Sequence, residues 1–392
     1  MQWVKSLDDG RMSRRSWTNL AFMTLTVAVA SLAMACGPEK PPSTTGSGGS
    51  AGSGSSSGGA GGAGGGAGGD GGAGGKVVEM PGPVEEVVKF DWIMGELGEG
   101  LAIDGTTAYV SFGSLKVVKV DLLTKTKTDF GNIAANLGEA APQGLALDAQ
   151  KNLYVAVTSD PVKFKPGIYK FPQAGGAATL FAEHPNMSYP RGIAFAKTGE
   201  MVVPSPPGAR MFVVLPNGQV NDPGVNQDLS GDQSSPCAYG DNLPYGVSSV
   251  AFDGSAFYGT NADRGHVFSG GLAQDMNGNV FAVPDKMAIF AGPDCATLGG
   301  ADGIVVDSLD PNGDALFPTM YVAARAADKI TKVEISGATT VIADKTMLYE
   351  PSAMAMAAID GDRYLYILNS ARKTFNTGGV PGLVRIRLGK SK

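Results

Sequence analysis

The sequence is poor in the residues on which many catalytic and metal centres depend. Its 392 residues include only two histidines, His184 and His266, and three cysteines. Two histidines so far apart are too few for a histidine metal cluster or a shared catalytic triad, and Ser-His-Asp, Cys-His and phosphate-loop patterns are absent. We therefore expect both histidines to be ordinary surface or turn residues.

Positive charge and long apolar stretches are also scarce. Lys and Arg number 31 against 37 Asp and Glu, a net charge of −6, and no basic run is present to hold nucleic acid. The apolar stretch from Leu20 to Ala35 is too short and too rich in small residues for a comfortable membrane span. We expect no nucleic-acid partner, and contact with a membrane only through an anchor.

The same apolar stretch predicts an export signal over residues 1–35, since basic residues precede it. It ends in Leu32-Ala-Met-Ala-Cys36, which resembles the lipobox of bacterial lipoproteins, although Ala33 stands where leucine is usual. The resemblance implies that the Cys36 thiol takes a diacylglycerol and that Cys36 becomes the new N-terminus. Ser13-Arg14-Arg15-Ser16-Trp17 faintly resembles a twin-arginine signal, so the Sec and twin-arginine routes both stay open.

Residues 36–75 predict the lipidated cysteine and a disordered tether, because they are dominated by glycine, serine and alanine. A random coil of about 39 residues reaches about 35 Å, enough to hold a folded domain clear of the lipid headgroups. Gly37 after the cysteine does not suggest retention at the inner membrane. We expect a lipid anchor at the outer membrane of the cell envelope, with the protein facing either side.

The remaining residues, 76–392, are organised around a phrase of small, apolar and acidic residues that occurs six times. Its plainest copy is Ala301-Asp302-Gly303-Ile304-Val305-Val306-Asp307, followed by a turn and a second strand. The copies lie 44, 48, 57, 54 and 50 residues apart, counted at Gly100, Gly144, Gly192, Ser249, Gly303 and Ala353. This is the period of a four-stranded blade, and blades of a propeller form one domain. The sequence therefore predicts an all-β fold, a six-bladed β-propeller.

The two ends of this domain predict how the ring closes. Blade six ends with its third strand, Leu383 to Leu388, and a sheet edge left there would expose unpaired backbone groups. A spare strand lies at the start of the domain, Glu86 to Asp91. We expect this N-terminal strand to complete the last blade.

The residue that precedes the small residue of each phrase defines a candidate site. The innermost strands of a propeller surround a channel and run the same way, so six equivalent residues form a ring at one mouth. We call this set the mouth ring: Glu99, Gln143, Arg191, Ser248, Asp302 and Ser352. In blade four, Tyr245 is an alternative to Ser248. The ring is either a ligand site or only the polar rim that residues at strand starts provide.

Two of the phrases resemble motifs of a known superfamily. Leu97-Gly-Glu-Gly-Leu101 and Ala301 to Asp307 are similar to motifs of the senescence-marker-protein (regucalcin), gluconolactonase and luciferin-regenerating-enzyme superfamily, calcium- or zinc-dependent lactonases and related esterases; NHL-type propellers share the rhythm. The resemblance implies that Glu99 and Asp302 bind a divalent metal, calcium or another, and that Asp302 can act as a catalytic base. The two asparagines that complete that metal shell are missing, since Arg191 and Ser248 or Tyr245 occupy their blades.

Two functions of different classes therefore remain. In the first, the propeller is a monomeric binding or scaffold module at the cell envelope, with a small molecule or an envelope protein at its mouth. In the second, Glu99 and Asp302 form the active site of a metal-dependent lactonase or esterase. Two carboxylates there repel unless a cation or Arg191 stands between them. For the second function we expect the carboxylates to face the entrance within about 8 Å of each other, a span that a hydrated divalent ion bridges.

The cysteines left after lipidation of Cys36 predict a disulfide. Cys237 and Cys295 both lie in loops that approach successive blades at the same rim. An exported protein meets an oxidising compartment, so we expect them to pair.

A last candidate is a possible calcium loop, Asp307-Ser-Leu-Asp310-Pro-Asn312-Gly313-Asp314. It lacks the glycine at position six and the acid at position twelve that such loops need. A hairpin turn between two strands of blade five is the interpretation that we favour.

Overall fold

The computed structural model describes residues 80–239, 245–254, 256–307 and 318–390. The predicted export signal, Cys36 and the tether lie outside the described residues, and so does the candidate loop that follows Asp307. The contacts separate Met1–Gly72 from a second compact unit, Ala73–Lys392, to which all described residues belong. No helix among the described residues is both long and apolar enough to cross a membrane.

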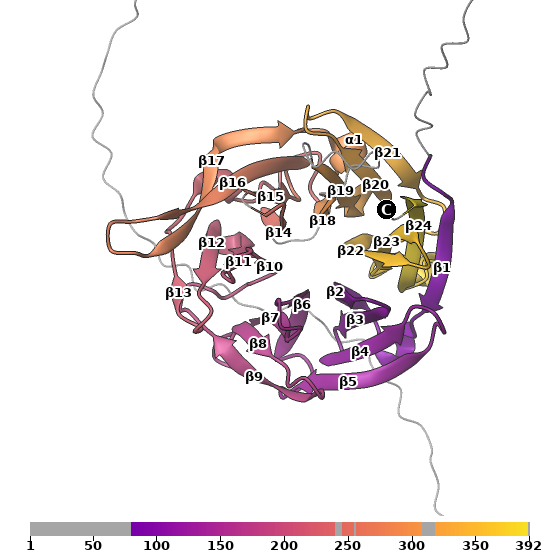
Figure 1. Cartoon of the computed structure of the whole chain (residues 1–392), viewed down its shortest axis with the longest axis horizontal. Coiled ribbons are helices and arrows are strands. Elements are labelled where there is room, and N and C mark those ends of the chain that lie inside the picture. The colour runs from indigo at the N-terminus through magenta and orange to yellow at the C-terminus, as the bar shows by residue number, and fades with distance from the viewer. Residues whose placement is uncertain (1–79, 240–244, 255, 308–317, 391–392) are drawn as a thin grey trace, which may run out of the picture. The chain divides into compact units, whose positions relative to one another are not determined.

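The described residues form 24 strands, arranged as six four-stranded blades in a ring (Figure 1). Blade one contains β2 (Gly98–Asp104), β3 (Thr107–Phe112), β4 (Lys116–Asp121) and β5 (Lys127–Ile133), and blade two contains β6 (Ala140–Leu147), β7 (Leu153–Ser159), β8 (Gly167–Lys170) and β9 (Gly176–Ala182). Blade three contains β10 (Ala194–Phe195), β11 (Met201–Ser205), β12 (Arg210–Val214) and β13 (Val220–Asn221), and blade four contains β14 (Val247–Phe252), β15 (Ala256–Asn261), β16 (His266–Gln274) and β17 (Val280–Ala291). Blade five contains β18 (Ala301–Asp307), β19 (Thr319–Ala324), β20 (Lys329–Val333) and β21 (Thr339–Asp344), and blade six contains β22 (Pro351–Ile359), β23 (Asp362–Asn369), β24 (Gly382–Lys390) and β1 (Val84–Lys89). The connections hold short helical turns: η1 (Trp92–Met94), η2 (Pro206–Gly208), η3 (Gln227–Leu229), α1 (Cys295–Leu298), η4 (Arg325–Ala327) and η5 (Phe375–Thr377).

The ring closes between the two ends of the domain. The sheet of blade six has the order β1-β24-β23-β22, and β1 pairs antiparallel with β24 from Val84 opposite Ile386 to Lys89 opposite Gly382. This confirms both the six-bladed propeller and its closure by an N-terminal strand. Since both closing strands belong to Ala73–Lys392, this unit holds every strand of the ring and can be studied by itself.

The small residue of the repeated phrase has a steric reason. A side chain at Gly100 would place its Cβ 2.2 Å from the backbone oxygen of Gln143, and one at Gly144 would come within 2.5 Å of the oxygen of Arg191. Gly303 meets the oxygen of Ser352 in the same way, at 2.8 Å. The inner strands therefore approach one another backbone to backbone, which only a glycine or a very small residue permits.

Six hydrophobic clusters hold the described blades together, one at each interface between neighbours. Phe112 of blade one, for example, packs in one cluster with Tyr366 of blade six, and both side chains are fully buried. Blades one and two are also joined at their outer edges, where β5 pairs parallel with β9. No blade buries both of its faces alone, so the ring folds as one unit.

Candidate functional site

A narrow cavity of about 90 Å³ is enclosed by the inner strands of all six blades. Three successive residues of each blade line it, and the first of the three is in every case a member of the mouth ring. A cavity needs about 10–15 Å³ to hold one water, whereas pockets for drug-sized ligands measure about 300–1,000 Å³. The channel can hold a few waters or an ion, but it has no room for a sugar-sized substrate.

Asp302 is held at this mouth by three side chains. Nη2 of Arg191 lies 3.3 Å from each carboxylate oxygen, and Nη1 of Arg325 lies 3.1 Å from Oδ2. The hydroxyl of Ser248 donates to Oδ1 at 2.5 Å. These donors occupy both oxygens of a carboxylate that is only 9% exposed, so little of its capacity remains for a metal ion.

Glu99 is paired with arginines by charge, although its Oε1 makes no hydrogen bond among the described residues. Its Oε1 lies 2.5 Å from Nε of Arg372 and 3.7 Å from Nη2 of Arg325. Arg325 therefore contacts both carboxylates at once. It stands in the place where we expected a cation or Arg191, and one guanidinium replaces the positive charge that a metal would have supplied.

The buried charges of this network balance. Burial opposes the charge on Arg191 and is the largest single effect, but Asp302, Tyr245 and Glu99 together outweigh it and raise the pKa of Arg191 above its usual value. The pKa of Arg325 is raised well above its usual value, because Glu99 and Asp302 together outweigh its burial. Two buried guanidiniums thus match two buried carboxylates. Among the residues that the structure describes, no group of three or more His, Cys, Asp and Glu could hold a metal.

Two tyrosines from the long insertion between blades three and four lie over the arginines. The ring of Tyr245 is centred 4.6 Å from the guanidinium carbon of Arg191, and that of Tyr239 lies 4.8 Å from that of Arg325. The two rings meet edge to face at 6.0 Å. The Tyr239 hydroxyl donates to the Glu350 carboxylate at 2.5 Å, which carries the insertion across to blade six. The mouth is therefore covered on its outer side.

This covering segment, residues 230–239 with Tyr245 and Gly246, is called the cap. The carboxylate of Asp263 accepts hydrogen bonds from the backbone N–H groups of Asp232, Tyr245 and Gly246, at 2.8 to 3.4 Å. These bonds hold both ends of the cap to the loop that follows β15.

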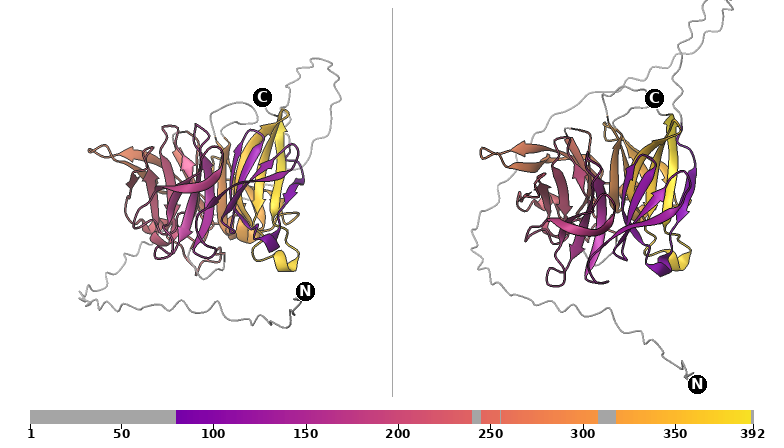
Figure 2. Two further views of the ribbon diagram at one scale, coloured as in Figure 1. Left: turned by 90° about the horizontal axis from the view of Figure 1, so that it is seen from below. Right: turned by 60° about the horizontal axis from the view of Figure 1, so that its bottom comes forward.

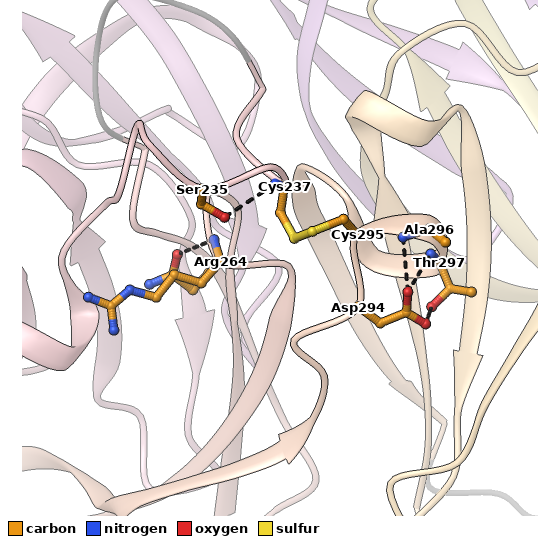
Figure 3. Close-up of a disulfide and its surroundings, with 8 residues drawn as sticks. Ser235, Cys237, Arg264, Asp294, Cys295, Ala296 and Thr297 are labelled. Atoms are coloured by element: carbon orange, nitrogen blue, oxygen red, sulfur yellow. Dashed lines mark hydrogen bonds between the residues drawn. A yellow bond between two sulfur atoms is a disulfide. The ribbon is translucent and has the colours of Figure 1, made fainter.

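The cap is also attached covalently to the loop before blade five. Cys237 forms a disulfide with Cys295, and their α-carbons lie 4.6 Å apart (Figure 3). The side chain of Asp294 accepts hydrogen bonds from the N–H groups of Ala296 and Thr297, which fixes the turn that carries Cys295. The predicted disulfide is confirmed. It indicates an extracytoplasmic protein, because disulfides persist in oxidising compartments.

The structure places the mouth-ring residues together but adds partners that the sequence did not reveal. Tyr245 lies over Arg191 in the cap, and Ser248 is the blade-four residue that lines the channel. Arg325 and Arg372 follow the ends of β19 and β23, the second strands of their blades. A second strand runs antiparallel to the first, so its end returns to the mouth. A basic residue at that position was the available signal.

The comparisons with known proteins agree with the fold. No protein-family model and no curated protein matches the sequence. Among solved structures, the chain is similar to a calcium-binding protein, regucalcin, from Agrobacterium tumefaciens, with a TM-score of 0.53 and 18% identity over 79% of this chain and 95% of that one. It is also similar to an aldose sugar dehydrogenase with bound PQQ from Streptomyces coelicolor, with a TM-score of 0.52 and 13% identity over 79% of this chain and 99% of that one.

A third similar structure is an auxiliary nutrient binding protein from Bacteroides ovatus, with a TM-score of 0.52 and 11% identity over 75% of this chain and 69% of that one. These proteins bind or act on different things, and all share less than a quarter of their residues with this chain. The likeness therefore shows the propeller fold alone, and the function has to be argued from the site.

Proposed function

We propose that the chain is an exported binding or scaffold module of the cell envelope, held there by a lipid on Cys36 at the outer membrane. The observation that carries the proposal is the position of Arg325, which contacts both Glu99 and Asp302. A metal-dependent lactonase needs these carboxylates as metal ligands. Here they are neutralised by arginine in a mouth that the cap covers.

The size of the channel supports the same proposal. A cavity of about 90 Å³ cannot admit a lactone, so a partner would bind on the surface of the propeller rather than inside the channel. The disulfide fits a protein that works outside the cytoplasm, as an anchored envelope module would.

The test separates this function from the lactonase alternative. Calcium is titrated into the unit Ala73–Lys392 by calorimetry, and lactone hydrolysis is measured with calcium and with chelator. We expect no saturable calcium binding at millimolar concentration, and equal, background hydrolysis for the parent and for Asp302→Asn.

Asp104→Asn is the matched control, because it removes a carboxylate that pairs with Lys151 at the surface, away from the mouth. The opposite result would be calcium binding of millimolar or tighter affinity that is lost in Asp302→Asn, is kept in Asp104→Asn and is accompanied by calcium-dependent lactone hydrolysis. That result would favour the lactonase over the binding module.

A further inference from the structure

Several loops at the mouth rim expose large apolar side chains. Three of them are consecutive in η1, where Trp92 is 45% exposed, Ile93 is 74% exposed and Met94 is 69% exposed. Leu137, in the loop from β5 to β6, is 73% exposed, and Val162, in the loop from β7 to β8, is 93% exposed. β2 and β6 begin at the mouth, and β7 ends there. The turns that hold the five residues adjoin these strand ends, so all five residues belong to the same face of the ring.

The turn that carries η1 is held rigidly by its own polar groups. The carboxylate of Asp91 accepts a hydrogen bond from the N–H of Ile93 at 2.9 Å, and the N–H of Asp91 donates to Glu96 at 2.8 Å. Glu96 in turn pairs with Lys127 at 2.5 Å. Figure 2 shows this indigo turn, with the yellow segment around η5, extending beyond the strands at one face of the ring. The apolar side chains are thus presented outward by a fixed frame.

The other two tips are built in the same manner. The carboxylate of Glu139 accepts from the backbone and the side-chain amide of Asn136, both at 3.1 Å, and this closes the turn around Leu137. The carboxylate of Asp160 accepts from the N–H of Val162 at 3.0 Å. In each turn an acidic side chain bonds the local backbone while an apolar one points to solvent. Single exposed apolar residues are normal, so the three consecutive ones of η1 carry the inference, and Leu137 and Val162 add to it on the same rim.

A lipid bilayer is the occupant that fits these tips best. They stand on three separate turns along one rim, an arrangement that suits the broad surface of a bilayer better than the single groove of a protein partner. Tryptophan favours the membrane–water interface. At η1 itself the neighbouring Lys127 is already paired with Glu96, so the contact there is apolar rather than electrostatic.

The geometry of the chain allows this contact. β1 begins at the rim opposite the mouth, 48 residues after Cys36 (84 − 36). A chain of 48 residues can span at most about 160 Å, whereas the six residues of β1 span about 20 Å. A bilayer over the mouth rim would also hide no ligand path, because the mouth is filled by ion pairs and covered by the cap.

We propose that Trp92, Ile93 and Met94, with Leu137 and Val162, insert into the boundary between headgroups and acyl chains and hold the mouth rim against the membrane. The inference rests on the proposed envelope function, since the anchor at Cys36 keeps a bilayer within reach. It leaves the outer surface and the far rim of the propeller open to a partner.

The experiment uses Ala73–Lys392, which lacks Cys36 and contains Trp92 as its single tryptophan. Tryptophan emission is followed on addition of phosphatidylcholine vesicles, with and without brominated lipid. We expect a blue shift of the emission, quenching by the brominated lipid, and the same response in high salt and with anionic lipid. Ile93→Ser combined with Met94→Ser should weaken vesicle binding at least about tenfold, as the loss of two inserted side chains implies.

Met276→Ser is the matched control, because Met276 is fully exposed at the other ends of β16 and β17, on the opposite rim. It should bind vesicles as the parent does. Any of four results would overturn the proposal. Trp92 emission could stay unchanged when lipid is added, or could change with protein concentration and not with lipid. Vesicle binding could need anionic lipid and disappear in high salt, or Met276→Ser could weaken vesicle binding as much as the double variant does. The calcium and lactone assays do not involve η1, so failure here is distinct from failure of the proposed function.

Discussion

Asp302→Ala is expected to lower the free energy of unfolding by about 3–5 kcal/mol, because it removes one partner of a buried ion-pair network. Arg191 and Arg325 would keep their charges, because a guanidinium stays protonated in proteins, and would lose the carboxylate that both contact. Burying an unpaired charge costs far more than an ion pair contributes. Urea denaturation of Ala73–Lys392, followed by circular dichroism, measures the change.

Glu85→Ala is the control for this prediction. Glu85 pairs with Arg385 at 2.9 Å, but its side chain is 46% exposed, so the loss should stay within about 1 kcal/mol. A parent and an Asp302→Ala variant that unfold at the same urea concentration would show that the mouth network does not stabilise the ring.

Removal of the disulfide is expected to have the second large effect. Cys237 and Cys295 are 58 residues apart, and closing a loop of that length stabilises the folded state by about 4 kcal/mol in the chain-entropy model. The double variant Cys237→Ala, Cys295→Ala should therefore unfold at a lower urea concentration than the parent. Limited proteolysis should cut the cap faster, because Cys237 ties it to the loop before blade five.

A reductant supplies the control for the disulfide. It should lower the stability of the parent towards that of the double variant and leave the double variant unchanged. If the reductant lowers the midpoint of urea unfolding equally in both proteins, or in neither, the disulfide does not stabilise this fold. Vesicle binding through η1 should survive in either case, since η1 lies at the junction of blades six and one.

The mouth of this propeller holds a buried network of ion pairs that stabilises the ring. Arg325 bridges Glu99 and Asp302, Arg191 adds a second bond to Asp302, and two tyrosines cover the guanidiniums. Networks of this kind are sensitive to the loss of any one member, because each remaining charge is then buried alone. In the same network, arginines are paired with Glu99 and Asp302, the two acids that the sequence resemblance assigns to a metal ion.

The sequence by itself determined the parts of the fold that depend on local pattern. The repeated phrase predicts six blades because each copy needs a small residue where inner strands approach within van der Waals contact, as Gly100 does against Gln143. The missing fourth strand of blade six and the spare strand before β2 predicted the closure, since a sheet edge must be paired. The disulfide followed from compartment and loop position.

Only the tertiary structure decided what surrounds Glu99 and Asp302. Arg325 lies 23 residues after Asp302 and Arg372 lies on the last blade, outside the repeated phrase, so the phrase alone does not connect them with the acids. Tyr239 reaches Glu350 across 111 residues. These contacts arise because antiparallel second strands return to the mouth and an insertion crosses it, and the energy of a buried charge depends on its neighbours in space rather than in sequence.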